Sequence, residues 1–291
     1  MTILVTGATG TVGTQVVAQL TARGADTRAL VRDPVKAKLP AGVSAAQGDF
    51  LDVNAIRAAL KGISTLFLLN AVVPDELTQA LIALNLAREA GIERIVYFSV
   101  MHSDVYTNVP HFAGKYAVER MIETIGLQAT ILRPAYFMQN DVRLKDAISG
   151  HEIYPMPIGD KGLAMVDVRD IGEIAAIELL RREQASGPLP LDRIDLGGPD
   201  LLTGSSVARI WSEVLGRPIA YAGDDIAAFE QTMRGFAPSW MAYDIRMMIE
   251  RFQTDGLIPA PGDAERLTGM LGRPLRSYRD FASEMASQWR K

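Results

Sequence analysis

The sequence predicts an α/β protein with a doubly wound parallel sheet and a smaller, mixed C-terminal lobe, and three observations lead to this fold class. Short apolar segments that fit buried strands alternate with segments of helical periodicity through the first half of the chain. That alternation ends after Arg133 and Pro134, and prolines become frequent beyond them. The chain of 291 residues is long enough to bury a large core and still form a second lobe.

The strands and helices of the first half follow one another at the spacing of βαβ units. Val12, Val16, Val17 and Leu20 share one face of a helix that ends at Gly24. Right-handed crossovers would place such helices on both faces of a parallel sheet. Strands are expected at 3–6, 27–31, 43–46, 65–69, 94–99 and 128–132, with helices that end before Gly24, Gly62, Gly91 and Gly126.

The second half is expected to be mainly helical. Residues 1–133, closed by later segments around 164–198, would form the first domain, and residues 134–291 a smaller lobe. We expect that lobe to fold over the carboxyl ends of the strands and to bind the substrate there, because open α/β sheets bind ligands at that edge. Helices of the lobe are predicted at 170–180, 205–215, 224–252 and 277–291.

A glycine-rich turn lies directly between the first predicted strand and the first helix. Gly7 permits the tight turn, Gly10 lets the backbone approach a pyrophosphate, and Gly13 lets the helix pack close to the sheet. Backbone N–H groups at the start of the helix, together with the helix dipole, would face the phosphates. This context indicates a Rossmann-type site for a dinucleotide. The predicted contacts here are Gly7, Thr9, Gly10, Thr11, Val12 and Gly13.

The end of the second predicted strand indicates which dinucleotide binds. A site for NAD usually has an acidic residue there, whereas this chain has Arg32, with Lys36 one helical turn beyond. Both side chains suit a 2′-phosphate, so we expect NADP(H). The alternative is a solvated basic pair, which Asp33 would partly neutralise. Asp49 is expected near the adenine, although it fits a turn equally well.

Six short motifs follow one another along the chain, namely Gly7–Gly13, Val31–Lys36, Gly48-Asp49, His111–Lys115, Leu132–Pro134 and Asp167–Gly172. Taken together, they resemble the NmrA-like family of atypical short-chain dehydrogenases and reductases. The resemblance covers about residues 1–180 well, and it implies an NADP-binding domain with a small substrate lobe. Members include NAD(P)H-dependent quinone and dye reductases, and also regulators that sense the dinucleotide without turning it over.

The wider superfamily uses a Tyr-x-x-x-Lys pair and a serine after the fifth strand, and this chain departs from that pattern. The resemblance assigns the lysine to Lys115, which would bind the nicotinamide ribose, and the serine to Ser99. The alternative for Lys115 is a surface ion pair with Glu119, four residues further along the same helix. His111 stands in place of the tyrosine and would be a weak acid, orient the substrate, or simply lie exposed. Quinones and cationic dyes need no strong acid, because their reduced products are stabilised.

Residues that follow predicted strands complete the expected site. Asn70 and Ala71 should border the nicotinamide ribose, and Pro134 and Tyr136 should also contact the cofactor. The substrate would contact Phe137 and Asn140, together with Phe229 and Trp240 in the C-terminal lobe. Those last two belong to a stripe of aromatics and methionines that is more often core than pocket.

Composition narrows the classes of protein that remain. A net charge of −4 favours neither nucleic acid nor an anionic membrane, and the lack of cysteine excludes disulfides and thiolate metal sites. No histidine or carboxylate cluster has metal-ligand spacing, no signal peptide fits the first residues, and a cytoplasmic location is expected. The sequence thus predicts an NADPH-dependent reductase of a quinone or similar electron acceptor. An NADP(H)-sensing regulator is the alternative, an epimerase is weaker, and a homodimer is left open.

Overall fold

The structure is a computed structural model that describes residues 1–289, and the chain forms two compact units. Each unit is built from separate stretches of the chain. The first unit consists of Met1–Ser103, His111–Arg133 and Val168–Ile194, and the second of Asp104–Pro110, Pro134–Asp167 and the chain from Asp195 onward.

A seven-stranded sheet has the strand order β3-β2-β1-β4-β5-β6-β8. The first six strands pair in parallel, which confirms the predicted doubly wound α/β fold. β3 lies one residue beyond its predicted position, and β8 was not predicted. The strands are β1 (Thr2–Val5), β2 (Thr27–Val31), β3 (Ser44–Gln47), β4 (Ile63–Leu68), β5 (Arg94–Phe98), β6 (Ala129–Pro134) and β8 (Asp192–Leu196).

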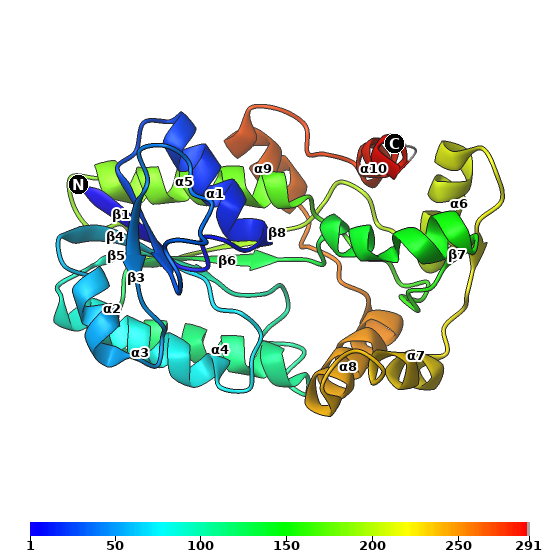
Figure 1. The fold of residues 1–291 in the computed structure, drawn as a ribbon, viewed down its shortest axis with the longest axis horizontal. Helices are drawn as coiled ribbons and strands as arrows, with labels where there is room; N and C mark the ends of the chain where they lie inside the picture. The colour runs from blue at the N-terminus through cyan, green and yellow to red at the C-terminus, as the bar shows by residue number, and fades with distance from the viewer. Residues whose placement is uncertain (290–291) are drawn as a thin grey trace. The chain divides into compact units, whose positions relative to one another are not determined.

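Helices cover both faces of this sheet, as the crossover rule predicts (Figure 1). α1 and α5 pack together on one face, and α2, α3 and α4 cover the other. The predicted apolar face of α1 is buried. The helices are α1 (Thr11–Ala22), α2 (Val53–Ala59), α3 (Glu76–Glu89), α4 (Pro110–Thr124) and α5 (Val168–Gln184).

A buried arginine fixes the chain that leads from α5 to β8. Arg182 is almost fully buried, and its Nε donates to the hydroxyl of Thr130 on β6 at 2.7 Å. Its remaining nitrogens donate to the backbone carbonyls of Gln128, Leu189 and Pro190. Burial lowers the pKa of Arg182 to about 10, and the guanidinium stays charged at neutral pH. β8 therefore takes its place through contacts that no local pattern in its own sequence reveals.

The second unit combines a small parallel strand pair with several helices. Trp211 stacks on Trp289 with ring centroids 4.9 Å apart and lies edge-on to Tyr278 in its core. The elements are η1 (Met138–Leu144), η2 (Asp146–Gly150), β7 (Ile153–Tyr154), α6 (Gly204–Leu215), β9 (Ala220–Tyr221), α7 (Ile226–Met233), α8 (Ser239–Asp255), α9 (Asp263–Leu271) and α10 (Tyr278–Trp289).

The segment 224–252 is helical, as predicted, and the structure divides it into two helices. α7 ends at Met233 and α8 begins at Ser239. Pro238 lies between them, and a proline lacks the N–H that a continuous helix needs and restricts the residue before it. Asp225 caps α7 by accepting a hydrogen bond from the N–H of Ala228 at 2.9 Å. α9 was not predicted at all.

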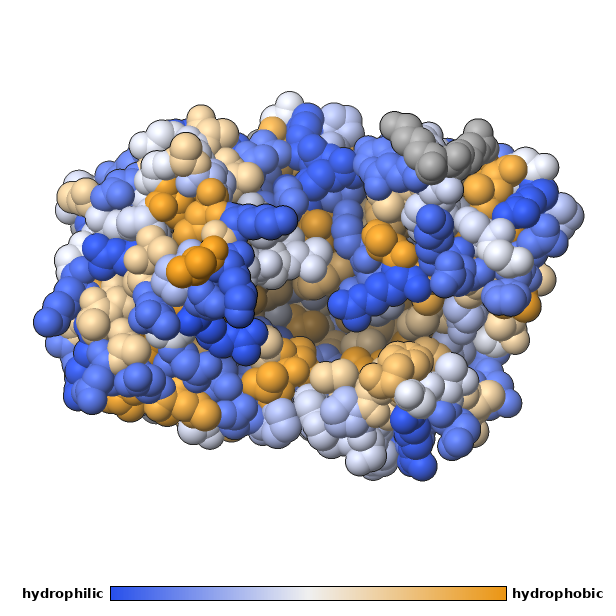
Figure 2. All heavy atoms as spheres, viewed as in Figure 1, coloured by the Kyte–Doolittle hydropathy of each residue, from blue (hydrophilic) through white to orange (hydrophobic). Residues whose placement is uncertain are grey.

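Polar and apolar side chains are interspersed on the face of the molecule that Figure 2 shows. In the part of the chain that the structure describes, no helix is both long enough and apolar enough to span a bilayer. Over the same residues, no three histidine or carboxylate side chains gather into a group that could hold a metal ion.

The contact between α1 and α5 leads to a first prediction. A Cβ added at Gly172 would lie 2.4 Å from the Cβ of Gln15, so Gly172→Ala must push the two helices apart. We expect a loss of about 2 kcal/mol or more in the free energy of unfolding, measured in urea. Gly114→Ala is the control, because a Cβ there meets nothing within 4 Å. Gly114→Ala should raise the free energy of unfolding by about 0.5–1 kcal/mol. Equal effects of the two substitutions would contradict the close approach.

Candidate functional site

The glycine turn between β1 and α1 has a backbone that only glycine fits at two positions. Gly7 has a φ of +62°, and a Cβ there would lie 2.4 Å from Cδ2 of Leu69. A Cβ at Gly13 would lie 2.1 Å from the carbonyl oxygen of Gly7. The predicted tasks of these glycines, the tight turn and the close packing of the helix on the sheet, thus have a steric basis in this structure.

The outer side of the same turn is open. Thr9, Gly10 and Thr11 are exposed, and a Cβ at Gly10 would meet only the carbonyl oxygen of Gly7, at 3.3 Å. Gly10 caps α1 without a side-chain hydrogen bond, and the first turn holds no acidic residue. The first N–H groups of a helix lack partners within that helix. The turn can therefore receive an anion such as a phosphate.

Thr6, which sequence reasoning missed, fastens this turn to β4. Its hydroxyl donates to the carbonyls of Phe67 and Leu69, at 3.1 and 3.0 Å, and accepts from the N–H of Leu69 at 2.8 Å. The carboxyl ends of β1 and β4 are thereby held together beside Asn70.

Asn70 is the most informative residue of the site. Its side chain is buried, with 6% of the residue exposed, and within residues 1–289 neither its amide oxygen nor its amide nitrogen has a hydrogen-bond partner. A buried polar group without a partner costs about 1–3 kcal/mol, so such a group fits a ligand that supplies the missing bonds. Ala71, the next residue, is exposed. The end of β4 thus presents an amide that can form hydrogen bonds with a bound cofactor.

Arg32 lies exposed directly after β2, and its acidic neighbour does not neutralise it. The carboxylate of Asp33 accepts from the backbone N–H groups of Val35 and Lys36, at 3.0 and 3.3 Å. The other oxygen of Asp33 pairs with Nζ of Lys36 at 3.2 Å. Within residues 1–289, no carboxylate forms an ion pair with Arg32. Asp33 thus partly neutralises the basic pair, as expected, but it does so through Lys36, and the Arg32 guanidinium is available to an anion.

Asp49 shapes the turn that leads into α2. Its carboxylate accepts from the N–H of Leu51, and its carbonyl accepts from the N–H of Asp52, both at 3.0 Å. Asp49 is therefore a turn residue, and its expected place near an adenine stays a prediction.

Lys115 is buried in α4 and pairs with a residue that sequence reasoning missed. Its Nζ lies 2.7 Å from Oε1 of Glu76 in the first turn of α3, and the two side chains are 8% and 9% exposed. The same Nζ donates to the carbonyl of Phe98 at 3.4 Å. The alternative of a surface pair with Glu119 is therefore wrong. Of its three N–H bonds, two are directed to these partners, which leaves one for a ligand.

Glu119 instead forms a buried network around the end of β5. Its carboxylate accepts from the hydroxyl of Ser99, from that of Ser103 at 2.9 Å, and from Nε of Arg133 at 3.0 Å. The Ser99 hydroxyl thus donates to Glu119, and any contact of Ser99 with a cofactor would have to use its lone pairs. No local pattern pointed to this network, because its members come from β5, α4 and β6.

His111 begins the same helix one turn before Lys115. It is half-buried, and its ring lies edge-on to that of Phe112 with centroids 4.7 Å apart. His111 is thus not a fully exposed histidine, and its role stays a prediction.

The residues predicted after β6 lie in the second unit. Pro134 is buried, and Tyr136 packs edge-on to Phe252 with centroids 6.1 Å apart. Burial and the nearby Asp141 carboxylate raise the pKa of Tyr136 well above its ordinary value, so it stays protonated. Phe137 pairs with Val166 as an isolated bridge, and Asn140 is half-buried in η1.

The aromatic stripe of α7 and α8 is not a core, which corrects the interpretation that the sequence favoured. α7 buries none of its residues, and Phe229 is half-buried. Phe236, Trp240 and Tyr243 are 74%, 37% and 49% exposed. α8 instead buries Ala242, Met248, Ile249 and Phe252, so its buried face does not include the aromatic residues of the stripe.

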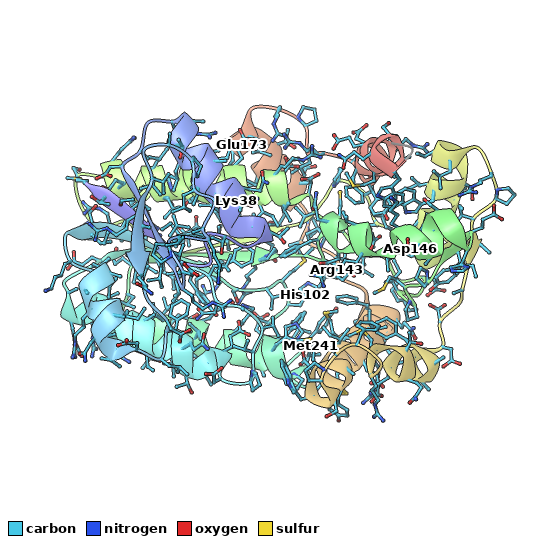
Figure 3. The ribbon with its side chains drawn as sticks, viewed as in Figure 1. Lys38, His102, Arg143, Asp146, Glu173 and Met241 are labelled. Carbon is cyan, nitrogen blue, oxygen red and sulfur yellow. The ribbon has the colours of Figure 1, made fainter. Side chains whose placement is uncertain are left out.

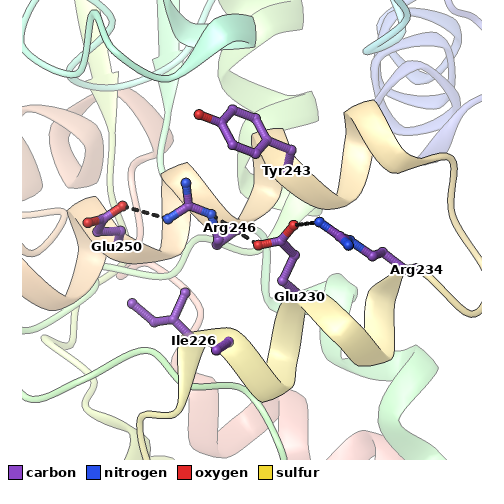
Figure 4. Close-up of a pocket in the computed structure, with 7 residues that line it drawn as sticks. Ile226, Glu230, Arg234, Tyr243, Arg246 and Glu250 are labelled. Carbon is purple, nitrogen blue, oxygen red and sulfur yellow. Dashed lines mark hydrogen bonds and ion pairs between the residues drawn. The ribbon is translucent and has the colours of Figure 1, made fainter.

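Charged residues join α7 to α8 around a shallow pocket (Figure 4). Glu230 pairs with Arg234 on its own helix and with Arg246 on α8, at 3.2 Å for the latter. Arg246 also pairs with Glu250 at 3.1 Å and lies over the ring of Tyr243 at 4.9 Å. These charges balance within the pair of helices, so the pocket carries no clear preference for an anion or a cation.

An open parallel sheet, a glycine turn at the start of α1 and an unsatisfied polar group at the end of β4 define a Rossmann-type protein of the dinucleotide-binding class. The model of the NmrA-like family matches residues 1–268. The chain belongs to the NmrA-like family.

Relatives and solved structures agree with this assignment over the whole chain. An NAD(P)H azoreductase of Xenophilus azovorans is 29% identical over 290 residues, with 98% of each chain covered. The NADPH complex of a quinone oxidoreductase of Escherichia coli superposes with a TM-score of 0.86 at 24% identity, covering 97% of this chain and 99% of that one. The triphenylmethane reductase of Citrobacter also gives 0.86, at 21% identity, with 99% and 100% covered. At these identities the two solved structures support the fold.

The stability of the second unit should depend on pH because of a buried carboxyl group, that of Asp141. The carboxyl group of Asp141 is fully buried, and its Oδ2 accepts from the hydroxyl of Tyr278 at 2.5 Å. Burial raises the pKa of Asp141 from 3.8 to about 7. Since the folded pKa exceeds the unfolded one, the stabilisation is complete below pH ~4 and is lost as the pH rises through about 7.

We therefore expect Asp141→Asn to flatten this pH dependence. Relative to the variant, the wild type should lose up to about 4 kcal/mol in the free energy of unfolding between pH 4 and pH 8. Urea unfolding followed by tryptophan fluorescence suits the test, because all three tryptophans lie in the second unit. A difference between the two proteins that stays constant with pH would show that Asp141 does not titrate in this range.

Proposed function

We propose that this protein is an NADPH-dependent reductase that transfers hydride to a quinone or a similar conjugated electrophile. Its family and the azoreductase relative support an NAD(P)H-dependent reductase. The observation that carries the proposal is the buried, unsatisfied amide of Asn70, next to an open glycine turn that can receive a pyrophosphate.

The residues of the first unit fit a nicotinamide dinucleotide along the carboxyl edge of the sheet. The turn from Thr9 to Val12 would hold the pyrophosphate, with the N–H groups of Thr11 and Val12 at the start of α1 as donors, because the N–H of Gly10 already donates to the carbonyl of Gly7 at 3.0 Å. Arg32 would hold the 2′-phosphate as a planar fork. Asn70 would give its amide to the nicotinamide ribose, and Lys115 its remaining N–H. When bound, NADPH supplies the hydride.

The chain contributes position and electrostatics rather than a strong acid. Glu76 compensates the charge of Lys115, so the lysine holds a defined place in a buried site. A tyrosine acid is missing, and the half-buried His111 occupies its position. Quinones and dyes tolerate this, since solvent can protonate a product whose negative charge is delocalised. An unactivated ketone would react poorly.

The acceptor contacts remain predictions. Phe137 and Asn140 follow β6, and Phe229 and Trp240 belong to α7 and α8, where they have exposed or half-buried aromatic surface that suits a flat ring. Binding of the acceptor by the second unit and formation of a homodimer are likewise part of the proposal.

The deciding experiment measures NADPH oxidation with a panel of quinones, azo dyes, triphenylmethane dyes, enones and simple ketones. We expect turnover with the first three classes and little with ketones. Tight binding of NADPH without turnover on any member would overturn the reductase and favour a dinucleotide sensor.

Arg32 should set the preference for NADPH over NADH. Arg32→Ala should weaken NADPH binding by about 1.5–3 kcal/mol, the size of a charge-assisted hydrogen bond, and leave NADH nearly unchanged. Lys36→Ala is the control and should cost less, because Lys36 is already paired with Asp33. Isothermal titration with both cofactors measures the effect. Equal losses for NADPH and NADH would mean that Arg32 does not read the 2′-phosphate.

Lys115 and His111 should differ in their importance for a quinone acceptor. Lys115→Ala should weaken cofactor binding and lower kcat/KM by about 10- to 100-fold, because it removes a ribose contact and leaves Glu76 unpaired. His111→Phe should change single-turnover rates only slightly, since no strong acid is needed. A defect in His111→Phe as large as that in Lys115→Ala would restore an acid role to the histidine.

A further inference from the structure

The turn after β5 contains a residue with an unusual backbone conformation. His102 has a φ of +59° and is one of two non-glycine residues with positive φ in the described part of the chain, the other being Glu152. The left-handed region costs an L-residue about 1–2 kcal/mol, and such residues persist where the surrounding structure enforces them, often at functional sites. His102 is half-buried and is labelled in Figure 3.

Buried groups hold this turn on both sides of His102. The hydroxyls of Ser99 and Ser103 donate to the same carboxylate oxygen, Oε1 of Glu119. Arg133 fixes that carboxylate in turn, and Met101 is fully buried. The left-handed conformation therefore does not belong to a loose surface loop, because the chain before and after it is anchored in the core.

The turn lies at the edge of the sheet where the cofactor residues gather. Leu68 and Tyr97 are paired in register, so Asn70 and Ser99 are level at the ends of β4 and β5. Lys115 reaches the same place, because its Nζ contacts the carbonyl of Phe98. His102 follows four residues after Phe98, beyond the carboxyl end of β5, where open α/β sheets bind their ligands.

We propose that His102 contacts the electron acceptor and donates a hydrogen bond from its imidazole to the acceptor atom that gains negative charge. This inference rests on the proposed reductase function and adds a residue that the histidine spacing in the sequence did not single out. The buried contacts that anchor the turn would then hold a donor in place at the reacting edge, and a donor so placed contributes through its fixed position. His111 is not required for this contact.

Two substitutions test the role without disturbing the turn. His102→Asn and His102→Gly remove the imidazole, and both residues tolerate the left-handed region. We expect an unchanged or higher melting temperature and an NADPH dissociation constant within about two-fold of the wild type. For 1,4-naphthoquinone, kcat/KM should fall by about 10- to 100-fold. The dissociation constant of the same quinone is measured by fluorescence quenching on the protein saturated with NADP⁺. It should rise by about five-fold or more.

Glu152→Asn provides the matched control, because Glu152 is the other left-handed residue and lies exposed in the second unit. It should leave kcat/KM and quinone binding unchanged. Retention of quinone binding and kcat/KM in both His102 variants would overturn the proposal, and so would a loss of NADPH binding in both, which would mark His102 as structural. Wild-type protein that binds NADPH but reduces no acceptor would refute the reductase function itself. If it also binds no quinone, both proposals fail.

Discussion

The carboxylate of Glu119 is the group on which the arrangement of the candidate site depends. It is completely buried, and removing a charge from water costs several kcal/mol unless partners replace the lost hydration. Ser99, Ser103 and Arg133 supply those partners. They belong to the end of β5, the turn that follows it and the end of β6, so one side chain of α4 fixes three neighbouring parts of the sheet edge.

The same helix carries a second buried charge of opposite sign. Lys115 and Glu119 lie one turn apart, a spacing that often gives a surface ion pair. Here each finds a partner elsewhere, and Lys115 pairs with Glu76 at the start of α3, where the helix dipole also favours a negative charge. The buried charges of Lys115 and Glu76 are therefore paired only because α3 and α4 pack side by side on the sheet. The site is a product of this packing as much as of its own residues.

Local periodicity was enough to predict the first six strands and the helices between them, because alternation and helical spacing reflect sterics within a few residues. The glycine turn was predictable for the same reason, since the requirement for glycine at Gly7 and Gly13 is met within a short segment. Periodicity did not show that the helical segment 224–252 divides into two helices before Pro238, and it missed a strand that depends on distant support. β8 is such a strand, because the buried Arg182 anchors the chain that leads into it.

The sequence by itself determined the fold class, the family resemblance and the positions of the glycine turn, Arg32 and Lys115. Only the tertiary structure decided which charges meet. Glu76 and Lys115 are far apart in the chain, and their pairing follows from the packing of two helices on one face of the sheet. The tertiary structure also decided that the amide of Asn70 is buried with no hydrogen-bond partner in the described part of the chain, and that His102 adopts a left-handed backbone. Burial and long-range contact depend on how distant segments pack, and no window of neighbouring residues contains that information.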